Sequence, residues 1–266
     1  MGTAAYGWIS LGRMDELGRL DTPVHRIDAR AHIIATAGFI IAVMSFPPHT
    51  VAALMPFFIF PVVLMSLGQI PSSVIFKKVI IASPFAMVVG MFNPLFDREP
   101  AIALGSWVIS GGWLSFVSIL VRFALTVSAA LTLVAITGMY RLASGLERLG
   151  VPAIFVNQLL FMYRYLFVLV DEGATMVRAV QMRSPGLRAL PIKVFGGLTG
   201  HLLLRAMDRA GRIHQAMVAR GFDGALRTGR ERSLAVRDVM FVVGWLLFFV
   251  AARRWNLTNL FTVPLP

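Results

Sequence analysis

The chain has 266 residues, of which 57% are hydrophobic and 14% charged, and its mean hydropathy is +0.75. Soluble domains carry about 25% charged residues, so this composition excludes an ordinary water-soluble protein and favours one embedded in a membrane. We attribute the net charge of +12 to cytoplasmic loops near anionic lipid or acidic partners and not to nucleic-acid binding. The absence of cysteine excludes disulfides and thiolate metal sites.

The first 30 residues precede the apolar runs and carry four arginines and four acidic residues. This mixture is unlike a signal peptide, so we predict that residues 1–30 form a cytoplasmic N-terminal segment. Four apolar runs follow within residues 31–137, and a fifth lies within residues 236–266. The runs are 31–46, 51–67, 79–92, 113–137 and 236–252.

A membrane-spanning helix needs about 20 apolar residues, and ~17 is the lower limit. The runs 31–46 and 79–92 are therefore long enough only if flanking residues join them. We predict an all-α, multi-pass protein of the cell (inner) membrane with about five transmembrane helices. Four of them lie in residues 31–137, and the last one, followed by a C-terminal tail, lies in 236–266. Counts of four or six remain open.

The positively charged residues gather in one long segment. Residues 139–235 hold 14 of the 25 Lys and Arg residues against six acidic ones, whereas residues 93–112 hold one Arg against two acidic ones. By the positive-inside rule we predict that residues 138–235 form a cytoplasmic helical domain and that the loop around Asp97 is external. Arg253-Arg254 would then lie outside, against the rule, which leaves the side of the C-terminus open.

Helical spacing runs through this cytoplasmic segment. In its second half, apolar residues recur every three or four positions, at Leu203, Ala206, Ala210, Ile213 and Met217. Residues 151–170 are apolar enough to span a membrane, but Asn157, Gln158 and Arg164 interrupt them. A buried charge costs ~2.5–3.5 kcal/mol on insertion scales, so we expect an interfacial or protein-packed helix there.

Two short stretches of this segment repeat each other at an offset of 37 residues. They are Ala179-Val-Gln-Met-Arg183-Ser184 and Ala216-Met-Val-Ala-Arg220-Gly221. The same offset relates Asp171 to Asp208, so an acidic residue precedes each arginine by 12 positions. We therefore predict two helices that carry an acid and a terminal arginine in the same register.

Each of these arginines ends a predicted helix. Ser184-Pro185-Gly186 follows Arg183 and Gly221 follows Arg220, and both are helix-stop signals. A cation in the last turn stabilises the helix dipole by ~0.3–1 kcal/mol, which explains either arginine taken alone. It does not explain their shared register. A role as helix stabilisers and a role in docking to a partner both remain open on the residues alone.

Several kinds of chemistry lack their sequence motifs. The chain has no P-loop, no G-x-G-x-x-G and no H-E-x-x-H motif, and its five histidines are scattered, so we predict neither catalysis nor a metal site. Arg122 is the only charge deep in an apolar run. Such a charge is either functional, or it snorkels toward the membrane surface or packs between helices, and we favour the second interpretation.

The chain resembles the transmembrane T component of energy-coupling-factor (ECF) transporters, and within that family the cobalt/nickel-type CbiQ group. The stretches that carry the resemblance are Leu20-Asp-Thr-Pro-Val-His25-Arg26-Ile-Asp28-Ala-Arg30, Gly150-Val-Pro152 and the X-Arg-X pair, Met182-Arg183-Ser184 and Ala219-Arg220-Gly221. The resemblance covers nearly the whole chain. It departs from the commoner pattern at Met182, where alanine is usual.

The resemblance implies a non-catalytic membrane scaffold of an ATP-driven importer, for cobalt or nickel ions. Its X-Arg-X ends would insert into grooves of two cytoplasmic ABC-type ATPase subunits, which bind the ATP and Mg²⁺, so this chain would need no cofactor of its own. A separate membrane S component, similar to CbiM, would bind the substrate. Asp171 and Asp208 are expected to support the two coupling helices. The lipid bilayer is the remaining partner, and nucleic acid is not expected.

Two other interpretations remain. A permease subunit of a conventional ABC importer would use residues 171–186 as its one coupling loop and would carry a substrate pathway through its spans. The two repeated elements and the nearly charge-free spans favour the T component over it. A membrane-embedded enzyme is a distant third interpretation, because no set of acids, bases or metal ligands serves it. The sequence leaves the transported substrate and the subunit stoichiometry open.

Overall fold

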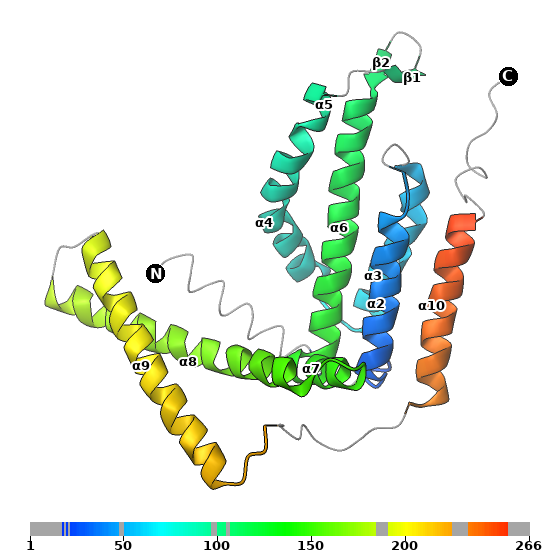
Figure 1. Cartoon of the computed structure of the whole chain (residues 1–266). Helices are drawn as coiled ribbons and strands as arrows, with labels where there is room; N and C mark the ends of the chain where they lie inside the picture. Colours follow the sequence, from blue (N-terminus) through cyan, green and yellow to red (C-terminus); the bar gives the residue numbers. More distant parts are fainter. Residues whose placement is uncertain are drawn as a thin grey trace. The chain divides into compact units, whose positions relative to one another are not determined.

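A computed structural model describes residues 18, 20, 22–47, 51–96, 100–104, 107–184, 191–224 and 234–254. These residues are predominantly helical, which confirms the predicted all-α class (Figure 1). The chain forms two compact units, one of Met1–Gly145 with Glu231–Pro266 and one of Leu146–Arg230. Most of the predicted segment 1–30 and the loop residues Asp97, Arg98 and Glu99 lie outside the described residues.

The first unit is a helical bundle with one small hairpin. Strands β1 (Pro100–Leu104) and β2 (Trp107–Ser110) pair antiparallel in the connection before α6. The helices are α2 (Ala29–Met44), the 3₁₀-helix η1 (Ala52–Phe58), α3 (Ile59–Leu67), α4 (Ser72–Met91), α5 (Asn93–Phe96), α6 (Gly111–Thr137), α7 (Met139–Arg148) and α10 (Val236–Arg254).

All five predicted apolar runs are helical, as α2, η1 with α3, α4, α6 and α10. By length and composition, α4 and α6 are long and apolar enough to cross a membrane, whereas α2 and Ala52–Leu67 are shorter apolar helices. The 3₁₀ turns of η1 rise about 2.0 Å per residue, so η1 and α3 together reach ~28 Å, close to the ~30 Å of a bilayer core. The charges of α10 lie at its two ends, beside an apolar middle.

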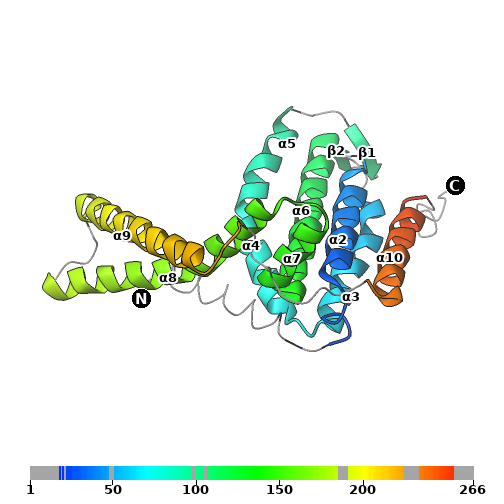
Figure 2. The ribbon, with the colours of Figure 1, turned by 60° about the horizontal axis from the view of Figure 1, so that its bottom comes forward.

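An aromatic cluster forms the centre of the bundle. The Phe39 ring of α2 stacks on the Phe60 ring at 4.7 Å, and Phe249 of α10 lies edge-on to Phe39 at 5.5 Å. Trp245 meets Phe60 in a T-shaped contact at 4.8 Å. Lipid tails are as apolar as these rings, so packing and not hydrophobicity must hold α10 to its neighbours. Figures 1 and 2 both show α10 beside α2, although they are far apart in sequence.

A buried polar junction joins the first turns of α2 and α10. Asp238 is 2% exposed; its Oδ2 accepts the N–H of Ala235 at 2.9 Å and its Oδ1 accepts the N–H of Asp28 at 3.1 Å. Asp28 is the N-cap of α2, and its side chain accepts the backbone N–H of Arg30. One carboxylate thus caps α10 and holds the residue that caps α2.

Arg141 of α7 completes the polar junction. Its Nη1 donates to the carbonyl of His25 at 2.6 Å and its Nη2 donates to that of Ile27 at 2.7 Å. Close packing brings α7 to this place, because a Cβ added to Gly145 would lie 2.9 Å from the Cβ of Ala29. The amino-terminal stretch that carries the family resemblance therefore lies in the polar junction between α7 and α10.

Arg122 packs within the protein. Its Nη2 donates to the carbonyl of Pro47, beyond the end of α2, at 2.6 Å. The hydrogen bond ties α6 to the connection between α2 and η1, which agrees with the interpretation of Arg122 as a packed charge.

The second unit contains two long helices, α8 (Ala153–Arg183) and α9 (Ile192–Ala219). Late residues of α8 contact early residues of α9, as where Gly173 meets Leu202, so the helices run antiparallel (Figure 2). Proline is the N-cap residue of each helix, at Pro152 and Pro191, where the helix does not need its missing N–H. By length and composition α8 is also apolar enough to cross a membrane. Hydropathy alone therefore does not distinguish α8 from the spans.

Candidate functional site

The two predicted X-Arg-X elements lie at helix ends. We call Met182, Arg183 and Ser184 the Arg183 tip. Arg183 is the last residue of α8, and the N–H of Ser184 donates to the carbonyl of Val180 at 3.1 Å. Met182 is 79% exposed and Arg183 is also exposed. Both side chains are therefore accessible to a partner in this unit.

The second element, Ala219, Arg220 and Gly221, is the Arg220 tip, and it ends α9 in a Schellman motif. The N–H of Phe222 donates to the carbonyl of Met217 at 3.0 Å, and the N–H of Gly221 donates to Val218 at 2.9 Å. Gly221 has a φ of +79°, a conformation that costs other residues about 1–2 kcal/mol. The glycine after Arg220 therefore shapes the turn that presents the arginine.

The antiparallel arrangement separates the two tips. Arg183 stands where the chain turns from α8 into α9, and Arg220 stands at the other end of α9. The 28 residues of α9 rise about 42 Å at 1.5 Å per residue. The two arginines are thus too far apart to share one small partner site.

Acidic residues join α8 to α9, but they are not the predicted ones. Glu172, whose side chain is 17% exposed, lies 3.2 Å from Nη1 of Arg205 and 3.1 Å from Nη2 of Arg209. The predicted support residues Asp171 and Asp208 are exposed, and no ion pair in the described part of the chain involves them. Their role as supports stays a prediction.

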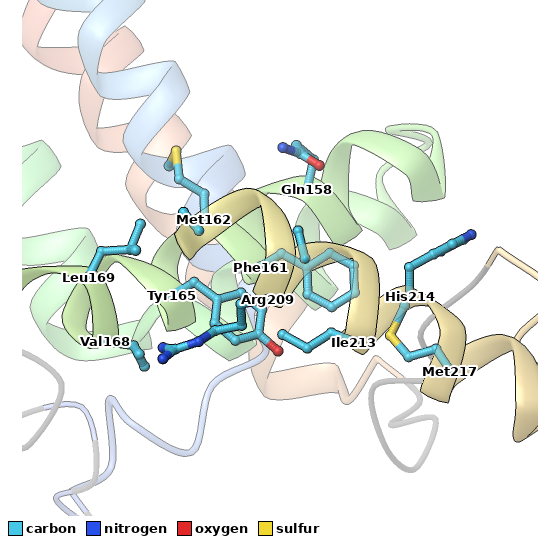
Figure 3. Close-up of a pocket in the computed structure, with 12 residues that line it drawn as sticks. Gln158, Phe161, Met162, Tyr165, Val168, Leu169, Arg209, Ile213, His214 and Met217 are labelled. Carbon is cyan, nitrogen blue, oxygen red and sulfur yellow. The ribbon is translucent and has the colours of Figure 1, made fainter. Parts of the chain in front are cut away.

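An apolar groove of about 370 Å³ lies between α8 and α9 (Figure 3). Phe161 and Tyr165 of α8 line it together with Ile213 and Met217 of α9. Four of the five residues of the apolar stripe predicted for α9 line this groove; they are Ala206, Ala210, Ile213 and Met217. The fifth, Leu203, is exposed. The predicted stripe is thus the face that α9 turns toward α8.

Asn157 makes a polar contact inside this unit. The residue is 6% exposed, between buried Val156 and Leu160, and its Nδ2 donates to the carbonyl of Gly224 at 2.7 Å. Gly224 follows Arg220 by four residues. The start of α8 is thereby joined to the segment that leaves the Arg220 tip.

Neither tip carries the groups that catalysis would need. Among the described residues, no group of three or more His, Cys, Asp or Glu side chains could hold a metal ion. Two exposed guanidinium groups on helix ends offer planar, always-charged forks, which suit carboxylate partners on another protein.

A family model described as "Cobalt transport protein", CbiQ, matches residues 21–230, which is more than half of the chain. The chain belongs to the CbiQ family. This membership confirms the resemblance to T components of ECF transporters of the cobalt/nickel type, and it agrees with a multi-pass protein of the cell (inner) membrane.

Curated relatives of this chain carry the names of nickel, cobalt and energy-coupling factor transport proteins. It is 29% identical to the nickel permease LarQ of Lactiplantibacillus plantarum over 54% of this chain and 60% of LarQ. It is 34% identical to the cobalt transport protein CbiQ of Rhodobacter capsulatus over 42% of this chain and 45% of that protein. The matches thus span about half of these two relatives. The energy-coupling factor transporter transmembrane protein EcfT of Heliobacterium modesticaldum is 27% identical over 89% of this chain and 94% of EcfT.

The CbiQ-family match includes both tips and the whole second unit. Sequence reasoning placed all six tip residues at helix ends, but it missed Glu172 and Asn157. Glu172 adjoins Asp171, and both acids line the same cavity beside Arg205, so no sequence signal distinguishes the acid that forms the ion pairs. Asn157 interrupted an apolar run, which was a signal that its amide needs a buried partner.

Proposed function

We propose that this chain is the coupling subunit of an ATP-driven ECF-type importer, in which Arg183 and Arg220 each dock on one cytoplasmic ABC-type ATPase subunit. The observation that supports the proposal most directly is the placement of two exposed X-Arg-X elements at opposite ends of one antiparallel helix pair. Two like elements separated by the length of α9, about 42 Å, fit two copies of a partner, or two similar partners.

In the proposed mechanism, the two ATPases bind ATP and Mg²⁺ and supply the energy, and this chain transmits the movement. The apolar residues between α8 and α9 and the ion pairs from Glu172 to Arg205 and Arg209 connect the two helices, so that a displacement at one tip would be carried along the pair as rigid-body motion. A separate membrane S component, CbiM-like, receives that motion and binds the substrate. This chain is accordingly non-catalytic and needs no cofactor.

We propose cobalt or nickel ions as the transported substrate. The support is the family model described as a cobalt transport protein, together with relatives named for nickel and cobalt. Selectivity between the two ions would belong to the S component, because metal specificity depends on the geometry of a ligand set.

Purification of the tagged chain from its native membrane tests this function. We expect two ATPase subunits and a small membrane protein to co-purify, with ATP hydrolysis by the complex and none by the isolated chain. Mass spectrometry identifies the partners, and calorimetry measures binding of Co²⁺ or Ni²⁺ to the isolated chain. Micromolar metal binding by the chain alone, or purification without any ATPase, would contradict the proposal.

The orientation can be tested with single cysteines, because the native chain has none. Asp97→Cys and Arg188→Cys introduce the thiols, at two positions outside the described residues. The asymmetry of Lys and Arg predicts that an impermeant maleimide added to intact cells labels position 97 and not position 188. Labelling after lysis controls for accessibility. The reverse pattern would place residues 138–235 outside and exclude contact with cytoplasmic ATPases.

A further inference from the structure

The structure gives the Arg220 tip a support that lies outside the X-Arg-X element. Two glycines with positive φ, Gly221 at +79° and Gly224 at +92°, turn the chain directly after Arg220. A Cβ at either position would meet no atom within 4 Å, so the turn needs glycine for its backbone conformation and not for space. The turn ends at the carbonyl that Asn157 binds.

Asn157 is an unusual residue for its place. It is buried in an apolar run, and a buried amide side chain without partners is costly. Its hydrogen bond to Gly224 joins residues 67 positions apart at 2.7 Å. The hydrogen bond joins the start of α8 to the segment that follows α9. The Schellman motif fixes the beginning of that segment, at Gly221 and Phe222, to the last turn of α9.

We propose that Asn157 is a positioning residue for the Arg220 tip, which it holds in the conformation that its partner binds. The inference rests on the proposed docking function. A helix end tied down on only one side frays, and ordering each backbone residue on binding costs about 1–2 kcal/mol. A tip that is ordered before it meets its partner avoids that cost and binds more tightly.

Loss of the Asn157 side chain should affect the Arg220 tip and not the Arg183 tip. Asn157 contacts the segment after Arg220, whereas Arg183 lies at the far end of α8, 26 residues and about 39 Å further along the helix. Loss of the Asn157 amide should therefore weaken the Arg220 joint and leave the Arg183 joint unchanged. A general loss of folding would weaken both.

The first measurement needs no ATPase. Hydrogen exchange of residues 217–224 is followed in the full chain, in nanodiscs, for Asn157→Leu and Asn157→Asp. Asn157→Leu fills the site with an apolar side chain. Asn157→Asp keeps the shape of the side chain but removes the Nδ2 donor. We expect exchange to be on the order of tenfold faster in both variants. Thr175→Val, which removes an exposed hydrogen-bonding side chain of α8, is the control and should change nothing. Unchanged exchange in the Asn157 variants would overturn the proposal.

The second measurement is a double-mutant cycle, with the ATPase subunits that co-purify with the unmodified chain as the probe. In an Arg183→Ala background, where the Arg220 joint alone remains, Asn157→Leu should lower ATPase affinity about tenfold. In an Arg220→Ala background it should have no effect beyond twofold. Equal losses in both backgrounds would show a merely structural role and overturn the proposal. If neither arginine variant alters ATPase binding, the docking function itself fails, and the exchange result shows whether Asn157 still holds the segment.

Discussion

Replacement of both Arg183 and Arg220 by glutamate is expected to leave a folded membrane protein that no longer assembles with ATPases or supports uptake. Both side chains are exposed at helix ends, so loss of the favourable dipole interaction should cost only about 1 kcal/mol of stability per site. A carboxylate left unpaired in a buried joint costs roughly 2–5 kcal/mol per site. That cost corresponds to a loss of about 30-fold to several-thousand-fold in affinity.

The matched control changes two other exposed arginines of the same helices. Arg178→Glu with Arg212→Glu alters the net charge by the same amount on α8 and α9 but away from the tips. The control should keep its ATPases. Pull-down of the ATPases, uptake of radioactive cobalt or nickel and thermal unfolding are measured on both double variants. If the Arg183/Arg220 variant keeps its ATPases and its uptake, these arginines act only as cations at helix ends and do not dock.

Asp238→Ala is expected to destabilise the bundle strongly. The change leaves the N–H groups of Asp28 and Ala235 without their carboxylate, and hydrogen bonds to a charged group are worth about 1.5–3 kcal/mol each. We expect a loss of about 3–5 kcal/mol, which lowers the Tm by roughly 6–20 °C at 2–4 °C per kcal/mol. Thermal unfolding in a mild detergent measures it.

A milder variant and a control are compared with Asp238→Ala. Asp238→Asn keeps one acceptor oxygen and should lose about half as much stability. His201→Ala removes an exposed side chain of α9 and should change the Tm little, because surface substitutions usually stay within about 0.5 kcal/mol. If Asp238→Ala unfolds at the same temperature as His201→Ala, the polar junction contributes nothing to stability.

Hydropathy predicted the helices well because it is a local property. All five apolar runs became helices, and the repeat at an offset of 37 residues marked both helix ends. Local patterns did not predict hydrogen bonds between residues that are far apart in the sequence. The bond from Asp28 to Asp238 joins residues 210 positions apart, and Asn157 meets Gly224 across 67. Nothing near Asp238 in the sequence indicates that its second oxygen binds the start of another helix.

The acids of the second unit show the same limit on a smaller scale. The repeat drew attention to Asp171 and Asp208, which share a register, whereas the ion pairs use the neighbouring Glu172. Adjacent residues on a helix point about 100° apart. A repeat in the sequence shows that two helices are alike, and only their packing decides which acid meets the other helix.

The polar junction and the aromatic cluster can form only late in the synthesis of the chain. Both need α10, the last described helix, because Asp238, Trp245 and Phe249 all belong to it. While the ribosome is still making the second unit, α10 does not yet exist, so the N–H of Asp28 lacks its carboxylate and the rings of Phe39 and Phe60 lack their partners on α10. We expect a product truncated before Val236 to be less stable than the bundle that includes α10.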